Sequence, residues 1–354
     1  MTDTQAIRVG VIGTGFGTLV QIPGFTRTPG FEVAAVASAR AERAQQAAEK
    51  FGIPKHYGDY RRMLEEVELD LVSITAPPYL HHEMVLAAAE AGCNILCEKP
   101  FATSLAEARE MVAAVESAGV LNFVDHEFRW LPPRPKMKAL IDEGYLGSLY
   151  SVSVASDSGM LLDPRKRLWS WWSDRSRYGG LLQAFTSHTI DTLIWMFGDI
   201  SKLCAQLDTF VKQRPTEQGE WREVTADDQN VMLLRFANGA QGTIHVSGVY
   251  RSSRGTIEAH GSDGSLVNEG ERLLGAKGGE PLKPIELSEL PALQLGDDGR
   301  IAPFLLNLEK LLPALRGQAV PDVATFRQGL RVQAVMDAIY ESSEQGSVVE
   351  VERV

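Results

Sequence analysis

The residues most able to do chemistry in this chain gather around the segment Ile95-Leu96-Cys97-Glu98-Lys99-Pro100. An apolar run of strand length leads straight into a charged pair and a proline. Proline disfavours helical geometry in the residue before it, so we expect Lys99 to be held extended with its amine directed at one place. Such a lysine, at the carboxyl end of a parallel strand, stands where open α/β sheets bind ligands and can orient a hydroxyl or share its proton. The alternative is a strand end with a solvated Glu–Lys pair.

A second motif, Gly13-Thr14-Gly15-Phe16-Gly17, directly follows the apolar run at residues 7–12. Glycines at its first and third places permit a tight turn and a close approach of the backbone to a pyrophosphate. The third position of the usual fingerprint is Thr18 instead of Gly or Ala. Because the motif lies between an expected strand and an expected helix, it predicts that Gly13, Thr14, Gly15, Phe16 and Gly17 bind a dinucleotide.

The second apolar run, residues 31–37, ends in Ser38-Ala39-Arg40, and Arg43 follows one helical turn later. A protein that reads the NAD ribose places an Asp or Glu here. A guanidinium suits a 2′-phosphate, which a carboxylate would repel. The pattern therefore favours NADP over NAD. The alternative is an ordinary helix start with exposed arginines.

Strand-like and helix-like stretches alternate throughout residues 1–124, which predicts a Rossmann domain with a doubly wound parallel sheet. Ser104-x-x-Glu107 is a capping box at the start of one of the helices. The expected strands are 7–12, 31–37, 69–75, 95–97 and 120–124, and the expected helices are 41–50, 60–66, 80–91 and 104–118.

From residue 125 onward, apolar residues recur with a period of two, as in Val152, Val154, Ile244 and Val246. This predicts an α+β domain, residues 125–354, with a large, mostly antiparallel open sheet. Helices are expected at 136–143, 181–197, 304–315 and 326–345, and the C-terminal helix is able to pack back on the first domain. Residues 268–300 are expected to be a surface loop.

The segment 168–180 holds three tryptophans among charged residues, unlike a buried core. Indole faces stack on sugar rings or nicotinamide, while Arg and Asp bind hydroxyls. A subunit interface would use the same residue types. Both alternatives stay open for Trp171 and Trp172.

The net charge of -11 argues against nucleic acid or an anionic membrane as a partner. The three cysteines, at 93, 97 and 204, form no metal-binding or CxxC spacing, so we expect reduced thiols and no metal. No apolar run is long enough to span a bilayer, and the N-terminus lacks the core of a signal peptide. We therefore expect a cytoplasmic protein.

Together these motifs resemble the Gfo/Idh/MocA family of NAD(P)-dependent oxidoreductases. The resemblance spans nearly the whole chain, and the Glu-Lys-Pro turn is its most specific part. The matching residues are Gly13-x-Gly15, Thr75-Ala76-Pro77 with His81, Glu98-Lys99-Pro100, Gly179-Gly180 with His188-x-x-Asp191, and Gly329-Leu330-Arg331.

The resemblance implies a Rossmann domain, a second domain whose open sheet commonly mediates oligomers, and hydride transfer at a carbinol carbon of a sugar, inositol or polyol. It also implies that Lys99 contacts the nicotinamide ribose and the substrate hydroxyl, and that His188 is the acid/base. Many family members carry an Asp one turn before that histidine, where this chain has Ala184. Either Lys99 and His188 do the acid/base work alone, or Arg129, Tyr178 or Asp191 takes over part of it.

The predicted function is NAD(P)-dependent dehydrogenation or reduction of a sugar-like substrate by a homo-oligomer, a dimer or tetramer. Alternatives are a redox-neutral epimerase or glycoside-cleaving enzyme with tightly bound nicotinamide, and a non-catalytic sugar or nucleotide sensor. The predicted catalytic residues are Lys99 and His188, and the predicted substrate-binding residues are Arg129, Trp172, Tyr178 and Asp191. The predicted cofactor-binding residues are Gly13, Thr14, Gly15, Phe16, Gly17, Ser38, Arg40, Arg43, Thr75, Ala76, Pro77, His81, Glu98, Lys99 and Trp171.

Overall fold

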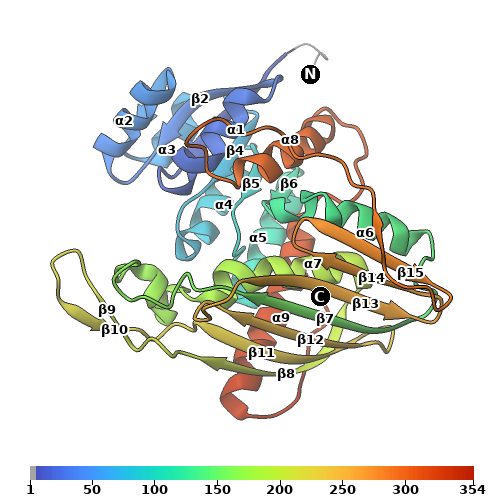
Figure 1. Cartoon of the computed structure of the whole chain (residues 1–354). Coiled ribbons are helices and arrows are strands. Elements are labelled where there is room, and N and C mark those ends of the chain that lie inside the picture. Colours follow the sequence, from blue (N-terminus) through green and yellow to red (C-terminus); the bar gives the residue numbers. More distant parts are fainter. Residues whose placement is uncertain (1–4) are drawn as a thin grey trace. The chain divides into compact units, whose positions relative to one another are not determined.

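A computed structural model describes residues 5–354 of the chain. The chain divides into two compact units (Figure 1). Unit 1 comprises Met1–Trp130, as far as described, and Leu290–Leu330. Unit 2 comprises Leu131–Glu289 and Arg331–Val354. Each unit contains one main sheet.

Unit 1 is built on a six-stranded sheet in the order β3-β2-β1-β4-β5-β6, and every pair in it is parallel. Parallel strands covered on both faces read as continuous apolar runs, and the central strands here are almost wholly buried. This confirms the predicted Rossmann architecture. The strands are β1 (Ile7–Ile12), β2 (Phe31–Ala37), β3 (Lys55–Tyr57), β4 (Leu71–Ile74), β5 (Asn94–Cys97) and β6 (Asn122–Val124).

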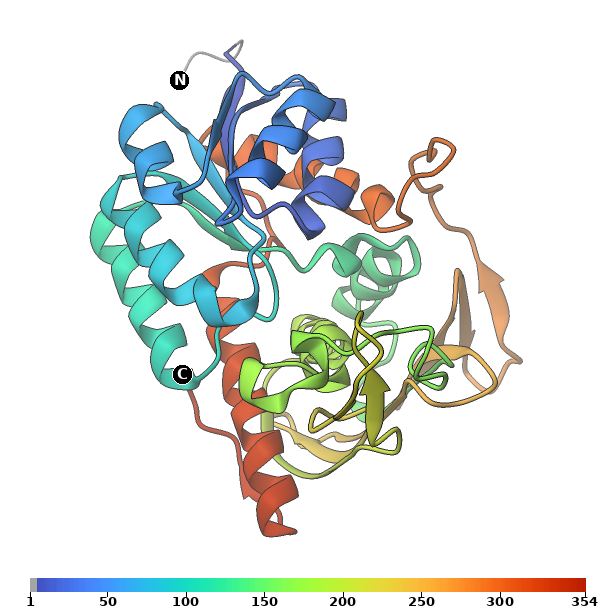
Figure 2. The same ribbon diagram turned by 90° about the vertical axis from the view of Figure 1, so that its left-hand side faces the viewer.

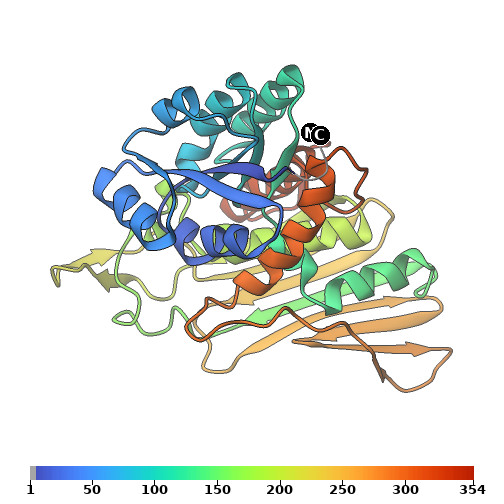
Figure 3. The same cartoon turned by 90° about the horizontal axis from the view of Figure 1, so that it is seen from above.

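Helices cover both faces of this sheet (Figure 2). One face carries α1 (Ile22–Arg27), α2 (Ala41–Phe51) and α8 (Ile301–Leu315). The other carries α3 (Tyr60–Glu66), α4 (His81–Glu90) and α5 (Leu105–Ala118). Figure 3 shows α8 beside α1, although the two are far apart in the sequence.

The capping box before α5 forms with one change of partner. The Ser104 hydroxyl accepts the backbone N–H of Glu107 at 3.2 Å, as predicted. The Glu107 carboxylate accepts the N–H of Thr103 at 3.0 Å, one residue before the expected donor. Ser104 thus satisfies a backbone donor of the first helical turn, and Glu107 binds the backbone of the residue before the N-cap.

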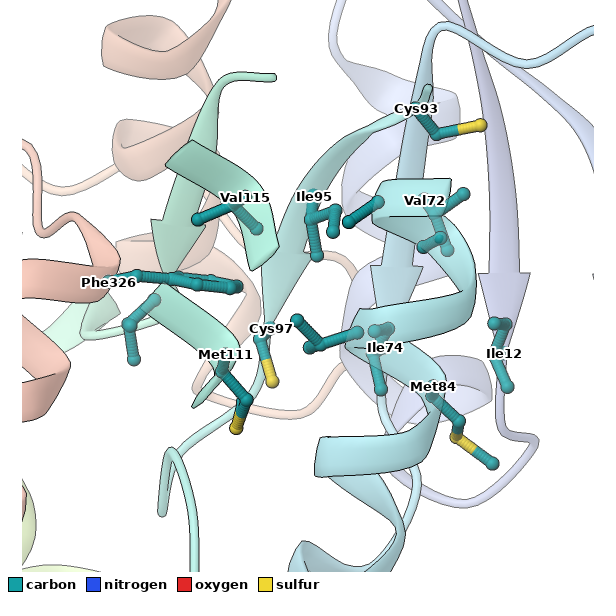
Figure 4. Packing of buried hydrophobic residues seen from close by; sticks show 14 of the residues in the cluster. Ile12, Val72, Ile74, Met84, Cys93, Ile95, Cys97, Met111, Val115 and Phe326 are labelled. Atoms are coloured by element: carbon teal, nitrogen blue, oxygen red, sulfur yellow. The ribbon is translucent and has the colours of Figure 1, made fainter. Parts of the chain in front are cut away.

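One face of the sheet packs against α4 and α5 through a cluster of buried apolar side chains (Figure 4). Phe326, at the start of α9 (Phe326–Gln345), joins this cluster with its ring centroid 4.6 Å from that of Phe101. A Cβ at Gly329 would lie 2.8 Å from the Phe101 ring, so no larger residue fits there without a shift. This close packing gives a physical reason for glycine in Gly329-Leu330-Arg331.

Unit 2 is built on a nine-stranded sheet in the order β16-β15-β14-β13-β7-β12-β11-β8-β17. All its pairs are antiparallel except β12 with β7, so the sheet is mixed but mostly antiparallel, as predicted. The strands are β7 (Leu149–Asp157), β8 (Ile200–Asp208), β11 (Gln229–Phe236), β12 (Gln241–Ser247), β13 (Arg254–Gly261), β14 (Gly264–Glu269), β15 (Arg272–Lys277), β16 (Lys283–Ile285) and β17 (Val349–Glu350).

Helices α6 (Pro133–Asp142) and α7 (Ser187–Phe197) lie on one face of this sheet (Figure 1). A separate hairpin, β9 (Gln213–Pro215) with β10 (Trp221–Glu223), extends beyond the sheet (Figure 3). Along β11, inward residues such as Met232 are buried, whereas Leu233 is 62% exposed. Within residues 5–354, no helix combines the length and the apolar character needed to cross a membrane.

Two expectations differ from the structure. Residues 268–300, expected to be loop, contain β15, which lies between Gly270 and Gly278, and β16, which contains Pro284; Gly and Pro are both rare in strands. Residues 125–130 and 290–330 belong to unit 1, whereas the predicted boundary assigns them to the second domain. The reason is packing, because the face of α8 holding Phe304 and Leu308 is fully buried in the core with α1.

We predict that the return of α8 to unit 1 contributes strongly to stability. Phe304 is fully buried, and its ring meets that of Phe25 edge-on at 5.4 Å. Phe304→Ala should lower the free energy of unfolding by about 3–5 kcal/mol, the usual cost of deleting a buried phenylalanine ring. Urea unfolding followed by circular dichroism measures this. Leu295→Ala, at a fully exposed position of the same segment, is the control and should change little. Equal effects of the two substitutions would contradict the prediction.

Candidate active site

Five strands of unit 1 are followed directly by a glycine or by a residue with a polar side chain. Gly13 follows β1, Ser38 follows β2, Thr75 follows β4, Glu98 follows β5 and Asp125 follows β6. Because the strands are parallel, all these residues lie at the carboxyl edge of the sheet. This edge is the candidate site of unit 1.

The glycine-rich loop is locked against Thr75. The Thr75 hydroxyl donates to the carbonyls of Ile12 or Gly13, at 3.1 and 3.0 Å. A Cβ on Gly13 or Gly17 would lie within 2.8 Å of this hydroxyl oxygen, and Gly13 also has a φ of 115°. By contrast, a Cβ on Gly15 would meet no atom within 4 Å. Gly13 and Gly17 are therefore required by close packing against Thr75, whereas the backbone at Gly15 faces open space.

Beside this loop, the end of β2 carries a hydroxyl instead of a carboxylate. The Thr14 hydroxyl lies 3.2 Å from that of Ser38, which also accepts the N–H of Arg40 at 3.3 Å. The side chains of Arg40 and Arg43 are exposed at the start of α2. Neither guanidinium takes part in an ion pair with any residue of the described chain. Both are therefore available to an anionic ligand.

His81 is fully buried between the two loops that follow β4 and β5. Its Nε2 lies 2.8 Å from the carbonyl oxygen of Ala76, and its Nδ1 lies 3.0 Å from that of Pro100. Burial lowers the pKa of His81. The imidazole thus joins the Thr75-Ala76-Pro77 loop to the Glu-Lys-Pro turn. Because both ring nitrogens face backbone carbonyls, His81 is placed to position these loops and not to contact a ligand itself.

The Glu98 side chain turns away from solvent into a buried polar cluster beneath Lys99. The Gln21 amide donates to Glu98 at 2.7 Å and to Asp125 at 2.9 Å. Asn307 of α8 donates to the other Asp125 oxygen at 2.8 Å and accepts from the Trp130 indole at 2.9 Å. Buried polar groups require such partners, and here helices from both ends of the chain supply them.

Three carboxyl groups, those of Glu98, Asp125 and Glu127, are buried together near Lys99. Burial and the neighbouring charge of Glu98 raise the pKa of Asp125 well above its usual range, and it shares a hydrogen bond with Glu98. Burial also raises the pKa of Glu98, which the positive charge of Lys99 opposes. The same two effects, burial and the Glu98 charge, raise the pKa of Glu127 to about 8. Near neutral pH the cluster therefore holds protons as well as charge.

In unit 2, His188 lies near the start of α7 and is 4% exposed. The preceding turn, Leu182–Thr186, is π-helical. It contains Ala184 at the position where the resemblance expects an aspartate. Its neighbour Gln183 is buried and donates to the Tyr340 hydroxyl at 3.2 Å. A second side chain of this turn, Thr186, donates to Asn230 at 3.1 Å.

The start of this helical segment is capped from a distant part of unit 2. Asp227, buried just before β11, accepts the N–H of Leu182 on its carboxylate at 2.9 Å and that of Leu181 on its carbonyl. Asn230 also donates to this carboxylate, at 3.2 Å. A Cβ on Gly180 would lie 2.2 Å from the carboxylate, which explains the glycine there. Burial raises the pKa of Asp227 to about 7.

The tryptophan segment folds into two short 3₁₀ turns in unit 2, Trp171–Ser173 and Arg175–Arg177. The Arg167 guanidinium lies 3.8 Å from the centroid of the half-buried Trp172 ring. Tyr178 ends the second turn in the left-handed conformation, with its ring centroid 6.3 Å from that of Tyr340. Trp171 is also half-buried. One side of the Trp172 ring is therefore already engaged by protein.

Two predicted substrate-binding residues are deeply buried. Arg129, in unit 1, is 3% exposed and donates to the carbonyl of Asp322 at 2.8 Å. Asp191, on α7 of unit 2, is 1% exposed. The Arg129 contact ties the chain after β6 to the segment before α9.

Residues that sequence reasoning missed include Gln21, Asp125, Glu127 and Asn307 in unit 1, and Asp227 and Tyr340 in unit 2. Asp125 and Glu127 had a usable signal, because they follow a strand in the same way as Glu98. Asn307 and Tyr340 carried no signal, because each is a single polar residue in a helix far along the sequence.

Asp227 should make the stability of the protein depend on pH. A carboxyl whose pKa is higher in the folded than in the unfolded chain keeps its proton longer in the folded state, so the free energy of unfolding falls as pH rises from about 4 to about 7. Asp227→Asn keeps an acceptor for Leu182 and should flatten this fall. Thr186→Val removes only a hydrogen bond to Asn230 and should keep the wild-type slope. Urea unfolding at several pH values between about 4 and about 7 measures how the free energy of unfolding changes with pH. Equal pH dependence in the wild type and in Asp227→Asn would contradict the prediction.

Comparison with known proteins is consistent with this geometry. Residues 7–126 match the oxidoreductase family with an NAD-binding Rossmann fold. Residues 135–267 match the GFO/IDH/MocA C-terminal domain. An uncharacterised oxidoreductase of Synechocystis is 30% identical over 350 residues, which cover 95% of this chain and 94% of that protein.

Levoglucosan dehydrogenase of Pseudarthrobacter phenanthrenivorans is 31% identical over 295 residues, covering 76% of this chain and 75% of that protein. A solved structure of levoglucosan dehydrogenase in complex with NADH and L-sorbose superposes with a TM-score of 0.88 at 28% identity, covering 99% of this chain and 100% of that one. With both sequence and structure in agreement, the chain belongs to the Gfo/Idh/MocA family of oxidoreductases.

Proposed function

We propose that this oxidoreductase transfers a hydride between NADP and a carbinol or carbonyl carbon of a sugar or related polyol. The observation that carries the proposal is the carboxyl edge of the unit 1 sheet, where Lys99 and the glycine-rich loop are each fixed by buried hydrogen bonds. The relatives supply the substrate class, since levoglucosan dehydrogenase has been solved with NADH together with levoglucosan or L-sorbose.

The residues present fit a dinucleotide. The open space at Gly15 supports a close approach of pyrophosphate to the backbone, and Ser38 with Arg40 supports contact with the ribose and its 2′-phosphate. A bound nicotinamide would supply the hydride chemistry, and the protein supplies alignment. Of the predicted cofactor contacts, Glu98 and His81 are buried and would act by holding Lys99 and the loops in place.

Lys99 and His188 are the proposed acid/base residues. Lys99 would hold the substrate hydroxyl by its ammonium group and stabilise a developing alkoxide. His188 would take or return the hydroxyl proton. Glu127, protonated near neutral pH and electrostatically coupled to Lys99, gives unit 1 a proton reserve that Ala184 does not provide in unit 2.

The outer face of the unit 2 sheet supports a homo-oligomer, a dimer or tetramer. Val231 and Leu233 project from β11 with 40% and 62% of their surface exposed. Apolar residues gathered on one sheet face are typical of a surface that is covered by another chain. Measuring the mass in solution tests this part of the proposal.

The cofactor preference should depend on the end of β2. Arg40→Ala should weaken NADPH binding by about tenfold to a hundredfold, the worth of a charge-assisted hydrogen bond, and leave NADH binding nearly unchanged. Ser38→Asp is the matched variant and should reverse the preference, because a carboxylate accepts ribose hydroxyls and repels the phosphate. Isothermal titration of both cofactors measures these affinities. Equal affinity of the wild type for NADPH and NADH would reject the NADP assignment.

The activity itself is tested by incubating the protein with NADP⁺ or NAD⁺ and a panel of sugars and polyols, while following NAD(P)H absorbance. With the best substrate, Lys99→Met and His188→Asn should each lower kcat by at least about a hundredfold, as expected for the loss of an acid/base group. Lys55→Met, on the exposed strand β3, is the control and should keep wild-type turnover. Ligand-induced stabilisation without turnover in the wild type would favour a sensor over an enzyme.

A further inference from the structure

The segment before α8 is fastened to α1 by the ion pair of Arg27 and Asp297. Arg27, in the last turn of α1, forms two bonds to the Asp297 carboxylate, at 2.6 and 2.7 Å. Asp297 also accepts the backbone N–H of Gln294 at 2.7 Å, which closes the loop on itself. The Arg27 guanidinium and this N–H hold the pKa of Asp297 at about 2. The loop is thus anchored to the helix that begins behind the glycine-rich motif.

This anchored loop presents Arg300 to the glycine-rich motif. The Asp298 carboxylate accepts two hydrogen bonds from Arg300, one from Nε at 2.8 Å and one from Nη2 at 2.6 Å. The guanidinium plane is therefore held along one edge. The guanidinium carbon lies 4.8 Å from the centroid of the Phe16 ring. Phe16 stands between Gly15, whose backbone faces open space, and Gly17, which packs against Thr75. A cation from late in the sequence therefore flanks this loop.

The geometry leaves part of Arg300 available. Its side chain is 41% exposed, and Asp298 engages only Nε and Nη2. Within residues 5–354, Nη1 forms no hydrogen bond, although it carries two of the five N–H donors of a guanidinium. An arginine that served only to pack on Phe16 would not need a carboxylate to fix the orientation of its plane. Oriented donors suit phosphate oxygens.

The surrounding charge points the same way. Glu98 and Glu127 act on Arg300 electrostatically and favour a positively charged guanidinium at this place in unit 1. Thr14, on the other side of Gly15, contacts Ser38, the proposed ribose contact. The part of a dinucleotide lying between these two places is its pyrophosphate.

We infer that Arg300 binds the pyrophosphate of the dinucleotide cofactor through Nη1, with Asp298 and the Arg27–Asp297 anchor setting its position. The inference rests on the proposed function. It gives the segment 290–300, which lies outside the usual nucleotide-binding sequence, a direct part in cofactor affinity.

Titration calorimetry with three probes tests this: NADPH, ADP, which retains the pyrophosphate, and adenosine, which lacks it. Arg300→Ala should weaken NADPH and ADP by about tenfold to a hundredfold and leave adenosine unchanged, since only the first two carry the charged partner. Asp298→Asn, which keeps Arg300 but loosens its clamp, should weaken the same two probes by a smaller factor. Arg62→Ala, an exposed arginine paired with Glu66 on α3, should change nothing.

Unchanged ADP affinity in Arg300→Ala would overturn the inference while the proposed function stands. Equal weakening of ADP and adenosine would also overturn it, because Arg300 would then support the fold of the site. If Arg300→Ala unfolds, Asp298→Asn with the same probes decides the question by the same two criteria. If wild-type protein binds none of the probes, the proposed function and this inference fall together.

Discussion

The structure of unit 1 depends on one buried interaction, the Gln21 amide that joins the carboxyl groups of Glu98 and Asp125. Burying carboxyl groups costs free energy unless hydrogen bonds or protons compensate them. Here both compensations operate, because Gln21 and Asn307 donate hydrogen bonds and burial raises the pKa of Asp125. Since Glu98 immediately precedes Lys99 and accepts its backbone N–H, the cluster also fixes the turn that presents the lysine.

In unit 2, a single buried carboxyl group, that of Asp227, holds the segment that carries the proposed acid/base residue. Asp227 caps the start of the segment that carries His188 and receives no help from a local capping residue. The buried carboxylate accepts hydrogen bonds from the N–H of Leu182 and from Asn230, and the backbone carbonyl of Asp227 accepts the N–H of Leu181. In both units, a proposed acid/base residue thus stands on an element held by a buried carboxyl group. Such buried supports restrict side-chain orientation more strongly than exposed ion pairs do.

The return of α8 to unit 1 links fold and proposed function. Its apolar face completes the core beside α1, its Asn307 completes the buried polar cluster, and its N-cap residue is Arg300. A single helix thereby contributes to stability, to the position of Lys99 and to the proposed cofactor contact. The family assignment rests on the two matched domains, whereas these links arise from the packing of this particular chain.

The sequence alone determined the parallel sheet of unit 1, the mostly antiparallel sheet of unit 2, the glycine-rich turn and the place of Lys99 after β5. These follow from local periodicity and from the conformational limits of Gly and Pro, which act between near neighbours. The tertiary structure alone decided which residues support them. Gln21 meets Asp125 across 104 positions, Asn307 meets it across 182, and Asp227 meets Leu182 across 45. No local pattern encodes such pairs, because each forms only when separate elements pack together and leave a buried donor facing a buried acceptor.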